Sequence, residues 1–91
     1  MSPTDFEQAI ARVVESTEPG EIMTYGEVAL EAGRPGAARA VGSTLAKGGI
    51  DGWWRIVTST GRLVPGLEDE HAQRLRAEGV ELRNGRVRMR R

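Results

Sequence analysis

The chain has 91 residues, which is enough for one domain with one modest hydrophobic core. It contains no cysteine, so disulfides, thiolate metal sites, iron–sulfur clusters and thiol nucleophiles are excluded. Its 13 basic and 13 acidic residues give a net charge of zero, which by itself neither favours nor excludes a polyanionic partner.

The charges are distributed unevenly along the chain. Residues 1–32 contain seven acids and a single base, Arg12. Residues 33–67 contain one acid, Asp51, and five bases, which are Arg34, Arg39, Lys47, Arg55 and Arg62. This basic middle segment is a candidate phosphate-binding surface, although a solvated face with scattered arginines would give the same counts.

The sequence shows no targeting or membrane-spanning segment. Residues 1–5 lack a basic region followed by an apolar run, and no stretch has the length needed to cross a bilayer. We therefore expect a cytoplasmic protein with no membrane partner. We also expect neither a cofactor nor a bound metal ion.

Apolar periodicity and capping residues predict four helices, at about residues 5–16, 25–32, 37–47 and 68–78. The first two are expected to begin with capping boxes, formed by Thr4 with Glu7 and by Thr24 with Glu27. The last two are each followed by glycine, which is typical of a helix end.

The second and third predicted helices form a candidate helix-turn-helix over about residues 24–47. The sequence Gly-Arg-Pro-Gly at 33–36 cannot continue a helix and supplies the turn. The helix after it carries mostly small residues, among which the long cationic side chain of Arg39 stands out; the small residues include Ala37, Ala38, Ala40 and Gly42.

Such a helix is poorly suited to reading base edges in the major groove, which requires long polar side chains. Its thin surface suits close approach to a narrow minor groove, with one cationic side chain inserted. The alternative is that the small residues only let this helix pack tightly against its neighbours. That alternative does not explain a single arginine among alanines.

The stretch Gly-Trp-Trp-Arg-Ile-Val at 52–57 is the most unusual in the chain. We expect it to be a core strand with Trp53 and Trp54 on opposite faces, because neighbouring residues of a strand alternate. One indole would then anchor the core while the other lines a cavity or presents its ring to a ligand. The alternative that both indoles only pack in the core stays open.

The remaining segments carry weaker signals. Residues 58–64 are expected to form a turn and a short extended piece. His71 stands alone on a mostly polar helix, so we expect a solvated side chain with no catalytic or metal role. Asn84-Gly85 between two apolar stretches predicts a hairpin. With the tail Arg90-Arg91 it could be a wing near phosphates or only a solubilising edge.

Together these patterns predict a mainly α fold with small β elements. The expected architecture is a single winged-helix-like domain over residues 1–91, with the helix-turn-helix at about 24–47 and a C-terminal hairpin and tail at about 80–91.

Three segments, in this order, resemble the DNA-binding domain of O6-alkylguanine-DNA alkyltransferases, and more closely the bacterial alkyltransferase-like proteins. They are Met-Thr-Tyr-Gly-Glu-Val-Ala at 23–29, Ala-Ala-Arg-Ala-Val-Gly at 37–42 and Trp-Arg-Ile-Val at 54–57. The similarity extends from about Phe6 to Gly79. The motifs are specific in combination, although each alone would be weak.

The resemblance implies roles for individual residues in DNA binding. Tyr25 matches the tyrosine that crowds the phosphate beside the target nucleotide and helps to rotate it out. Arg39 matches the finger that enters the duplex and fills the vacated space. Lys47 is also expected to contact DNA, and the small residues of the helix in the minor groove are matched by Ala37, Ala38 and Gly42.

Alkyltransferases carry the acceptor thiol in a Pro-Cys-His-Arg motif. Alignment on Arg55 places Trp53 at the cysteine and Trp54 at the histidine, which makes these three residues the expected lesion pocket. Tryptophan in place of the cysteine is typical of alkyltransferase-like proteins. Most of them keep the proline and the histidine, however, whereas this chain has Gly52 and Trp54. The loops 47–51 and 62–67, which border the pocket in the family, look shorter than in the enzymes.

The resemblance therefore implies a non-enzymatic, monomeric protein that recognises O6-alkylguanine in duplex DNA, rotates the nucleotide out and marks the lesion for nucleotide excision repair proteins. Two alternatives belong to other classes. An active alkyltransferase is opposed by the missing cysteine, since no thiolate exists to accept the alkyl group. A winged-helix transcription regulator or protein-interaction module would keep the fold without lesion specificity.

Overall fold

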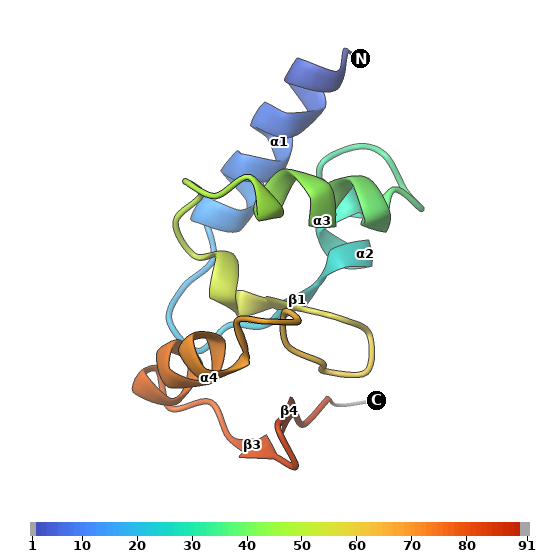
Figure 1. Cartoon of the computed structure of the whole chain (residues 1–91). Coiled ribbons are helices and arrows are strands. Elements are labelled where there is room, and N and C mark those ends of the chain that lie inside the picture. The colour runs from blue at the N-terminus through green and yellow to red at the C-terminus, as the bar shows by residue number, and fades with distance from the viewer. Residues whose placement is uncertain (1, 90–91) are drawn as a thin grey trace.

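The computed structural model describes residues 2–89, with four α-helices, one short 3-10 helix and four two-residue strands. In chain order the elements are α1 (Pro3–Glu15), β1 (Met23–Thr24), α2 (Tyr25–Glu31), α3 (Ala38–Ala46), η1 (Trp53–Arg55), β2 (Ile56–Val57), α4 (Glu68–Ala77), β3 (Leu82–Arg83) and β4 (Arg86–Val87). Figure 1 shows α1, α2 and α3 at one end of the molecule and α4 with the β3–β4 hairpin at the other. The prediction of a mainly α fold with small β elements is confirmed. None of the described helices is long and apolar enough to cross a membrane.

The three N-terminal helices enclose the larger hydrophobic cluster. Phe6, Ile10 and Val14 recur every four residues on α1, so they share one face of that helix and are buried against α2 and α3. The opposing residues are Val28 and Ala29 on α2, Val41 on α3, and Met23, Ala32 and Ile56. This packing holds α2 and α3 together as a helix-turn-helix.

A second cluster lies beneath α4, and the parallel pair of β1 and β2 joins it to the first. Met23 pairs with Ile56, and Thr24 with Val57. Neighbours on β2 face opposite ways, so Ile56 enters the larger cluster and Val57 the smaller one. The smaller cluster is completed by Leu63, Ala72, Leu75 and Val87. These two short strands therefore set how α4 sits relative to the helix-turn-helix.

The predicted capping box at the start of α2 is confirmed. The Thr24 hydroxyl accepts a hydrogen bond from the Glu27 backbone at 3.1 Å, and the Glu27 carboxylate accepts one from the Thr24 backbone at 2.7 Å. The box places Tyr25 as the first helical residue, directly after β1.

The predicted Thr4 cap of α1 is wrong. Ser2 caps this helix by accepting a hydrogen bond from Asp5 at 3.1 Å, and Pro3 is its first residue. Proline at the first helical position already has the required φ and lacks only an N–H that would be unpaired there. The helix therefore starts two residues earlier than the expected Asp5.

The predicted strand at 52–57 is also wrong over its first four residues. Gly52 adopts a left-handed conformation with φ of 88° and leads into η1, so only Ile56 and Val57 are extended. Trp53 and Trp54 consequently do not occupy opposite faces of a strand. Their ring centroids lie 6.1 Å apart with the planes at 87°, an edge-to-face pair.

The predicted C-terminal hairpin is present. Asn84 and Gly85 have φ of 55° and 75°, as the two central residues of a type I′ turn require. Leu82 pairs with Val87, and Arg86 also bridges to Arg62 in the loop after β2. The tail Arg90-Arg91 lies outside the described residues.

Candidate nucleic-acid interface

The outer face of α3 carries small residues, and packing within the protein does not explain all of them. Gly42 lies within this helix, where glycine costs about 0.5–1 kcal/mol relative to alanine. A Cβ added to Gly42 would have no atom within 4 Å. Tight packing against neighbouring helices therefore does not explain this glycine, and the face it lies on is open to close approach from outside.

Arg39 projects from the same face of α3. Its side chain is exposed and, among residues 2–89, has no hydrogen-bond or ion-pair partner. Lys47 at the end of the helix instead forms an ion pair with Glu7 of α1. Lys47 is exposed and Glu7 partly exposed, so this pair contributes little and could be exchanged for a phosphate at small cost.

A cavity of about 450 Å³ opens between α3, η1 and the start of α4. It brings together three of the residues predicted from sequence, Tyr25, Gly42 and Trp53. The remaining lining is contributed by Leu45, Ala46, Gly48, Gly49, Val64, Pro65, Leu67 and Glu70. Its size lies in the range of about 300–1,000 Å³ that is usual for ligand pockets, and its lining is mostly apolar.

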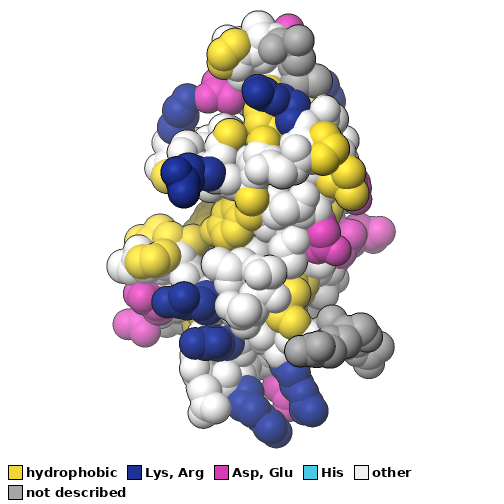
Figure 2. Space-filling model, turned by 90° about the vertical axis from the view of Figure 1, so that its right-hand side faces the viewer, with side chains coloured by type: hydrophobic (Ala, Val, Ile, Leu, Met, Phe, Trp, Pro, Cys, Tyr) yellow, Lys and Arg dark blue, Asp and Glu magenta, His cyan; other side chains and the backbone are white. Residues whose placement is uncertain are grey.

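This cavity adjoins the open face of α3. A second hollow, of about 560 Å³, shares Tyr25 and Gly42 with the first and also includes Ala38 and Arg39. Figure 2 shows hydrophobic side chains gathered around a hollow in the middle of one face, with Lys and Arg side chains above and below it. Burial raises the pKa of the Tyr25 phenol, which therefore stays uncharged at neutral pH.

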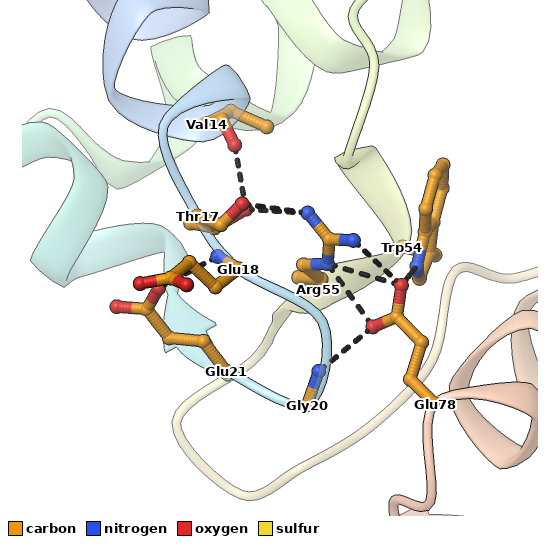
Figure 3. Close-up of polar contacts among 8 residues, drawn as sticks. All are labelled: Val14, Thr17, Glu18, Gly20, Glu21, Trp54, Arg55 and Glu78. Carbon is orange, nitrogen blue, oxygen red and sulfur yellow. Dashed lines mark hydrogen bonds and ion pairs between the residues drawn. The ribbon is translucent and has the colours of Figure 1, made fainter.

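The structure does not place Trp54 and Arg55 in the cavity with Trp53. Arg55 donates to the Glu78 carboxylate from Nε at 3.0 Å and from Nη2 at 2.6 Å, and the Trp54 indole donates to the same carboxylate at 2.9 Å. Arg55 Nη1 reaches back to the carbonyl of Thr17 at 2.8 Å. Figure 3 shows that this network joins the end of α1, the segment η1 and the end of α4. Trp54 and Arg55 thus position η1.

The network is charged at neutral pH. Hydrogen bonds from Arg55 lower the pKa of the Glu78 carboxyl to about 2, against the opposing effect of burial. The Gly20 backbone N–H, at 3.1 Å from Glu78, and the Trp54 indole act in the same direction. The carboxylate in turn raises the pKa of Arg55.

His71 is completely buried, so the prediction of a solvated side chain is wrong. Its Nδ1 accepts a hydrogen bond from the Val64 backbone at 3.1 Å, which leaves the proton on Nε2, 2.7 Å from the Trp54 carbonyl that accepts it. Its ring also lies 5.0 Å from that of Trp53. The side chain therefore supports two walls of the cavity at once, Trp53 and Val64.

The position of His71 could have been found from its spacing. It lies four residues before Leu75, so both fall on the apolar face of α4. Burial lowers the pKa of the imidazole, which favours the neutral form that both hydrogen bonds require.

The departure at Gly52 has a local cause. Its φ of 88° is unavailable to proline, and an added Cβ would approach the Val14 carbonyl oxygen to 3.0 Å. The turn into η1 therefore excludes proline at this position. Among residues 2–89, no group of three or more His, Asp or Glu side chains could hold a metal ion.

Residues 5–80 match the family described as 6-O-methylguanine DNA methyltransferase, DNA binding domain. The chain belongs to this family. It is 38% identical over 78 residues to the DNA base-flipping protein of Vibrio parahaemolyticus, covering 80% of this chain and 78% of that protein. The DNA base-flipping protein of Escherichia coli is also 38% identical, over 81 residues, but the chain spans only 62% of its length.

Solved structures agree with this assignment. One is S. pombe Atl1 in complex with damaged DNA containing O6-carboxymethylguanine, with a TM-score of 0.84, 29% identity and coverage of 91% of this chain and 83% of that one. Another is S. pombe ATL in complex with DNA, with a TM-score of 0.82, 27% identity and coverage of 99% of this chain and 93% of that one. The predicted alkyltransferase-like fold is confirmed.

The 91 residues include no cysteine, so they hold no thiol that could accept an alkyl group. The methylated-DNA–protein-cysteine methyltransferase of Mycobacterium tuberculosis is 49% identical over 39 residues, a match that covers 43% of this chain and 24% of that protein. The chain therefore has the DNA-binding domain of this family without the cysteine that accepts the alkyl group.

Proposed function

We propose that this protein binds duplex DNA containing O6-alkylguanine, rotates the modified nucleotide into the cavity beside Trp53 and holds it there without chemical change. The observation that carries the proposal is the position of Trp53. It forms a wall of a cavity that adjoins the open face of α3, and alignment on Arg55 matches it to the acceptor cysteine of the alkyltransferases. The proposal is supported by the similarity to two S. pombe structures in complex with DNA and to two bacterial DNA base-flipping proteins.

Binding contacts can offset the free-energy cost of extruding the nucleotide, so no chemical reaction is needed. Extruding a nucleotide costs a few kcal/mol, and least when the base is damaged or poorly paired. An aromatic ring stacked on the extruded base contributes about 1–3 kcal/mol. Arg39 would fill the vacated space and place its positive charge in the negative field of the minor groove. An alkyl group on O6 removes one Watson–Crick hydrogen bond and adds apolar area, so the lesion is extruded more easily and fits an apolar cavity better.

We assign the contacts as follows. Ala37, Ala38 and Gly42 lie against the minor groove, Arg39 enters the duplex, and Tyr25 crowds the phosphate between the groove and the cavity. Lys47 contributes a phosphate contact after leaving Glu7. In the lesion pocket, Trp53 contacts the extruded base, whereas Trp54 and Arg55 act by holding η1 in place.

The long-lived complex is the functional product. Because nothing is transferred, the lesion persists until another system removes it, and we propose that one copy of the protein marks it for nucleotide excision repair. A stable protein on extruded DNA presents a bulky distortion that such a system can recognise.

Competition binding tests the lesion preference. A labelled duplex with one O6-methylguanine is displaced by unlabelled duplexes of the same sequence that contain either O6-methylguanine or guanine. We expect the lesion duplex to compete much more strongly, in several unrelated sequences. A sequence-specific regulator would instead select among the sequences and ignore the lesion, and that result would refute the proposal.

A further inference from the structure

The lining of the cavity beside Trp53 includes one acidic side chain and no basic one. Among residues 2–89, Glu70 is the only acidic or basic residue that lines it. Tyr25 stays a neutral phenol, and the other lining residues are glycine or apolar. Figure 2 shows acidic side chains at the edge of the hydrophobic patch. An extruded base would therefore meet apolar walls and one carboxylate.

The nearest basic residue, Arg74, pairs with Glu70 from outside the cavity. Arg74 donates from Nε to the Glu70 carboxylate at 3.2 Å, one helical turn further along α4. Its guanidinium lies 4.7 Å from the ring centroid of Trp54 and 6.0 Å from that of Trp53. It lines a different hollow, of about 290 Å³, that includes both indoles. Trp53 and Gly49 border both spaces, and Arg74 does not line the cavity that Glu70 lines.

We propose that Glu70 makes the cavity select O6-alkyl groups by their charge, favouring uncharged and cationic groups over anionic ones such as carboxymethyl. This inference rests on the proposed function, because it concerns the alkyl group of the extruded guanine. A carboxylate on the alkyl chain would be brought near Glu70 and would lose water on the apolar side of the cavity. A protonated amine in the same place would be attracted.

The size of the effect follows from the exposure of Glu70. Its side chain is 51% exposed and that of Arg74 is 45% exposed, so water and salt screen the charge. We expect discrimination of about three- to tenfold at low salt, decreasing as salt is added. Glu70 also repels DNA phosphates in general, so the informative quantity is a ratio of two affinities and not one affinity.

The experiment uses four duplexes of one sequence, with guanine, O6-carbamoylmethylguanine, O6-carboxymethylguanine or O6-(2-aminoethyl)guanine at one position. The carbamoylmethyl group is the neutral amide of the carboxymethyl group and has nearly the same shape. For the wild-type chain, we expect the neutral lesion to bind about fivefold more tightly than the anionic one, and the cationic lesion to bind at least as tightly as the neutral one.

Variants then assign the selection to Glu70. Glu70→Gln keeps the shape and removes the charge, so the ratio of neutral to anionic affinity should fall to about one. Arg74→Gln removes the ion-pair partner and should increase the ratio. The matched control is Asp69→Asn, which changes the net charge equally at a neighbouring exposed residue of α4 that does not line the cavity. It should shift all four affinities together and leave the ratio unchanged.

The outcomes separate this inference from the proposed function. If neutral and anionic lesions bind equally to the wild-type chain, or if Glu70→Gln leaves their ratio unchanged, charge selection by Glu70 is refuted while lesion binding stands. If the neutral lesion binds no better than guanine, the proposed function fails, and this inference fails with it.

Discussion

Arg39 has the longest side chain of α3, and Gly42 has none. Neither contributes to the packing of the protein itself: Arg39 has no partner among the described residues, and the space beside Gly42 is open. A residue that stability does not require can be changed without disturbing the fold, so these two positions test DNA binding directly.

Arg39→Ala should weaken binding to O6-methylguanine duplexes by about 1–3 kcal/mol, the usual scale for a well-placed arginine contact. Its melting temperature should be unchanged, because the side chain is exposed and unpaired within residues 2–89. Fluorescence anisotropy measures the affinity. Arg12→Ala removes the same charge from α1 and serves as the control for general electrostatics. Equal losses in the two variants would show that Arg39 acts only through its charge.

Gly42→Ala should change stability and binding in opposite directions. Alanine is favoured over glycine in a helix by about 0.5–1 kcal/mol, and the new methyl group meets no atom within 4 Å, so thermal unfolding should shift upward. The same methyl group would hold the minor groove away from α3, so lesion binding should weaken. Ser43→Ala, at the next and exposed position, should leave affinity nearly unchanged. A more stable variant with full affinity would place the DNA elsewhere.

At the scale of elements, what could be predicted depended on how far apart the interacting residues are in sequence. The helices and the hairpin were predicted because apolar spacing, caps and the Asn84-Gly85 turn are local signals. The 3-10 conformation of Trp53 and Trp54 was not, because two adjacent aromatic residues carry no period and the deciding contact is between Gly52 and the end of α1.

The pairing of Arg55 with Glu78 was missed for the same reason. The two residues are 23 positions apart, and nothing local distinguishes Glu78 from the other acids of the chain. The sequence therefore grouped Trp53, Trp54 and Arg55 in one pocket. In the structure Trp53 lines the cavity, whereas the side chains of Trp54 and Arg55 turn toward the end of α4.

Glu78→Gln should destabilise the protein by about 3 kcal/mol, because it leaves the largely buried Arg55 without its countercharge. Urea unfolding at neutral pH measures the loss, and Glu81→Gln removes an exposed carboxylate nearby as the control. Lesion affinity should also fall at temperatures where the variant is still folded, since η1 carries Trp53. If stability is unchanged, the ion pair does not hold η1.

At the scale of the whole molecule, stability should depend on pH through two groups, His71 and Glu78, whose contributions begin to be lost at different pH values. The folded pKa of His71 is lowered below its usual value of 6.5, so the unfolded chain binds a proton first and stability is lost as pH falls below 6.5. The folded pKa of Glu78 is about 2 against 4.5 ordinarily, so its contribution is complete above pH 4.5 and is lost between 4.5 and 2.

The loss of stability just below pH 6.5 can be assigned to one side chain, because His71 is the only histidine in the chain. Urea midpoints between pH 7 and 5 should decrease for the wild-type protein and stay nearly level for His71→Gln, even though that variant is less stable at pH 7. Lesion binding should weaken over the same range, since protonation of Nδ1 removes the hydrogen bond that Val64 donates to it and so loosens one wall of the cavity. A wild-type midpoint that is constant from pH 7 to 5 would mean that the buried imidazole can accept a proton without cost, which its two hydrogen bonds and complete burial argue against.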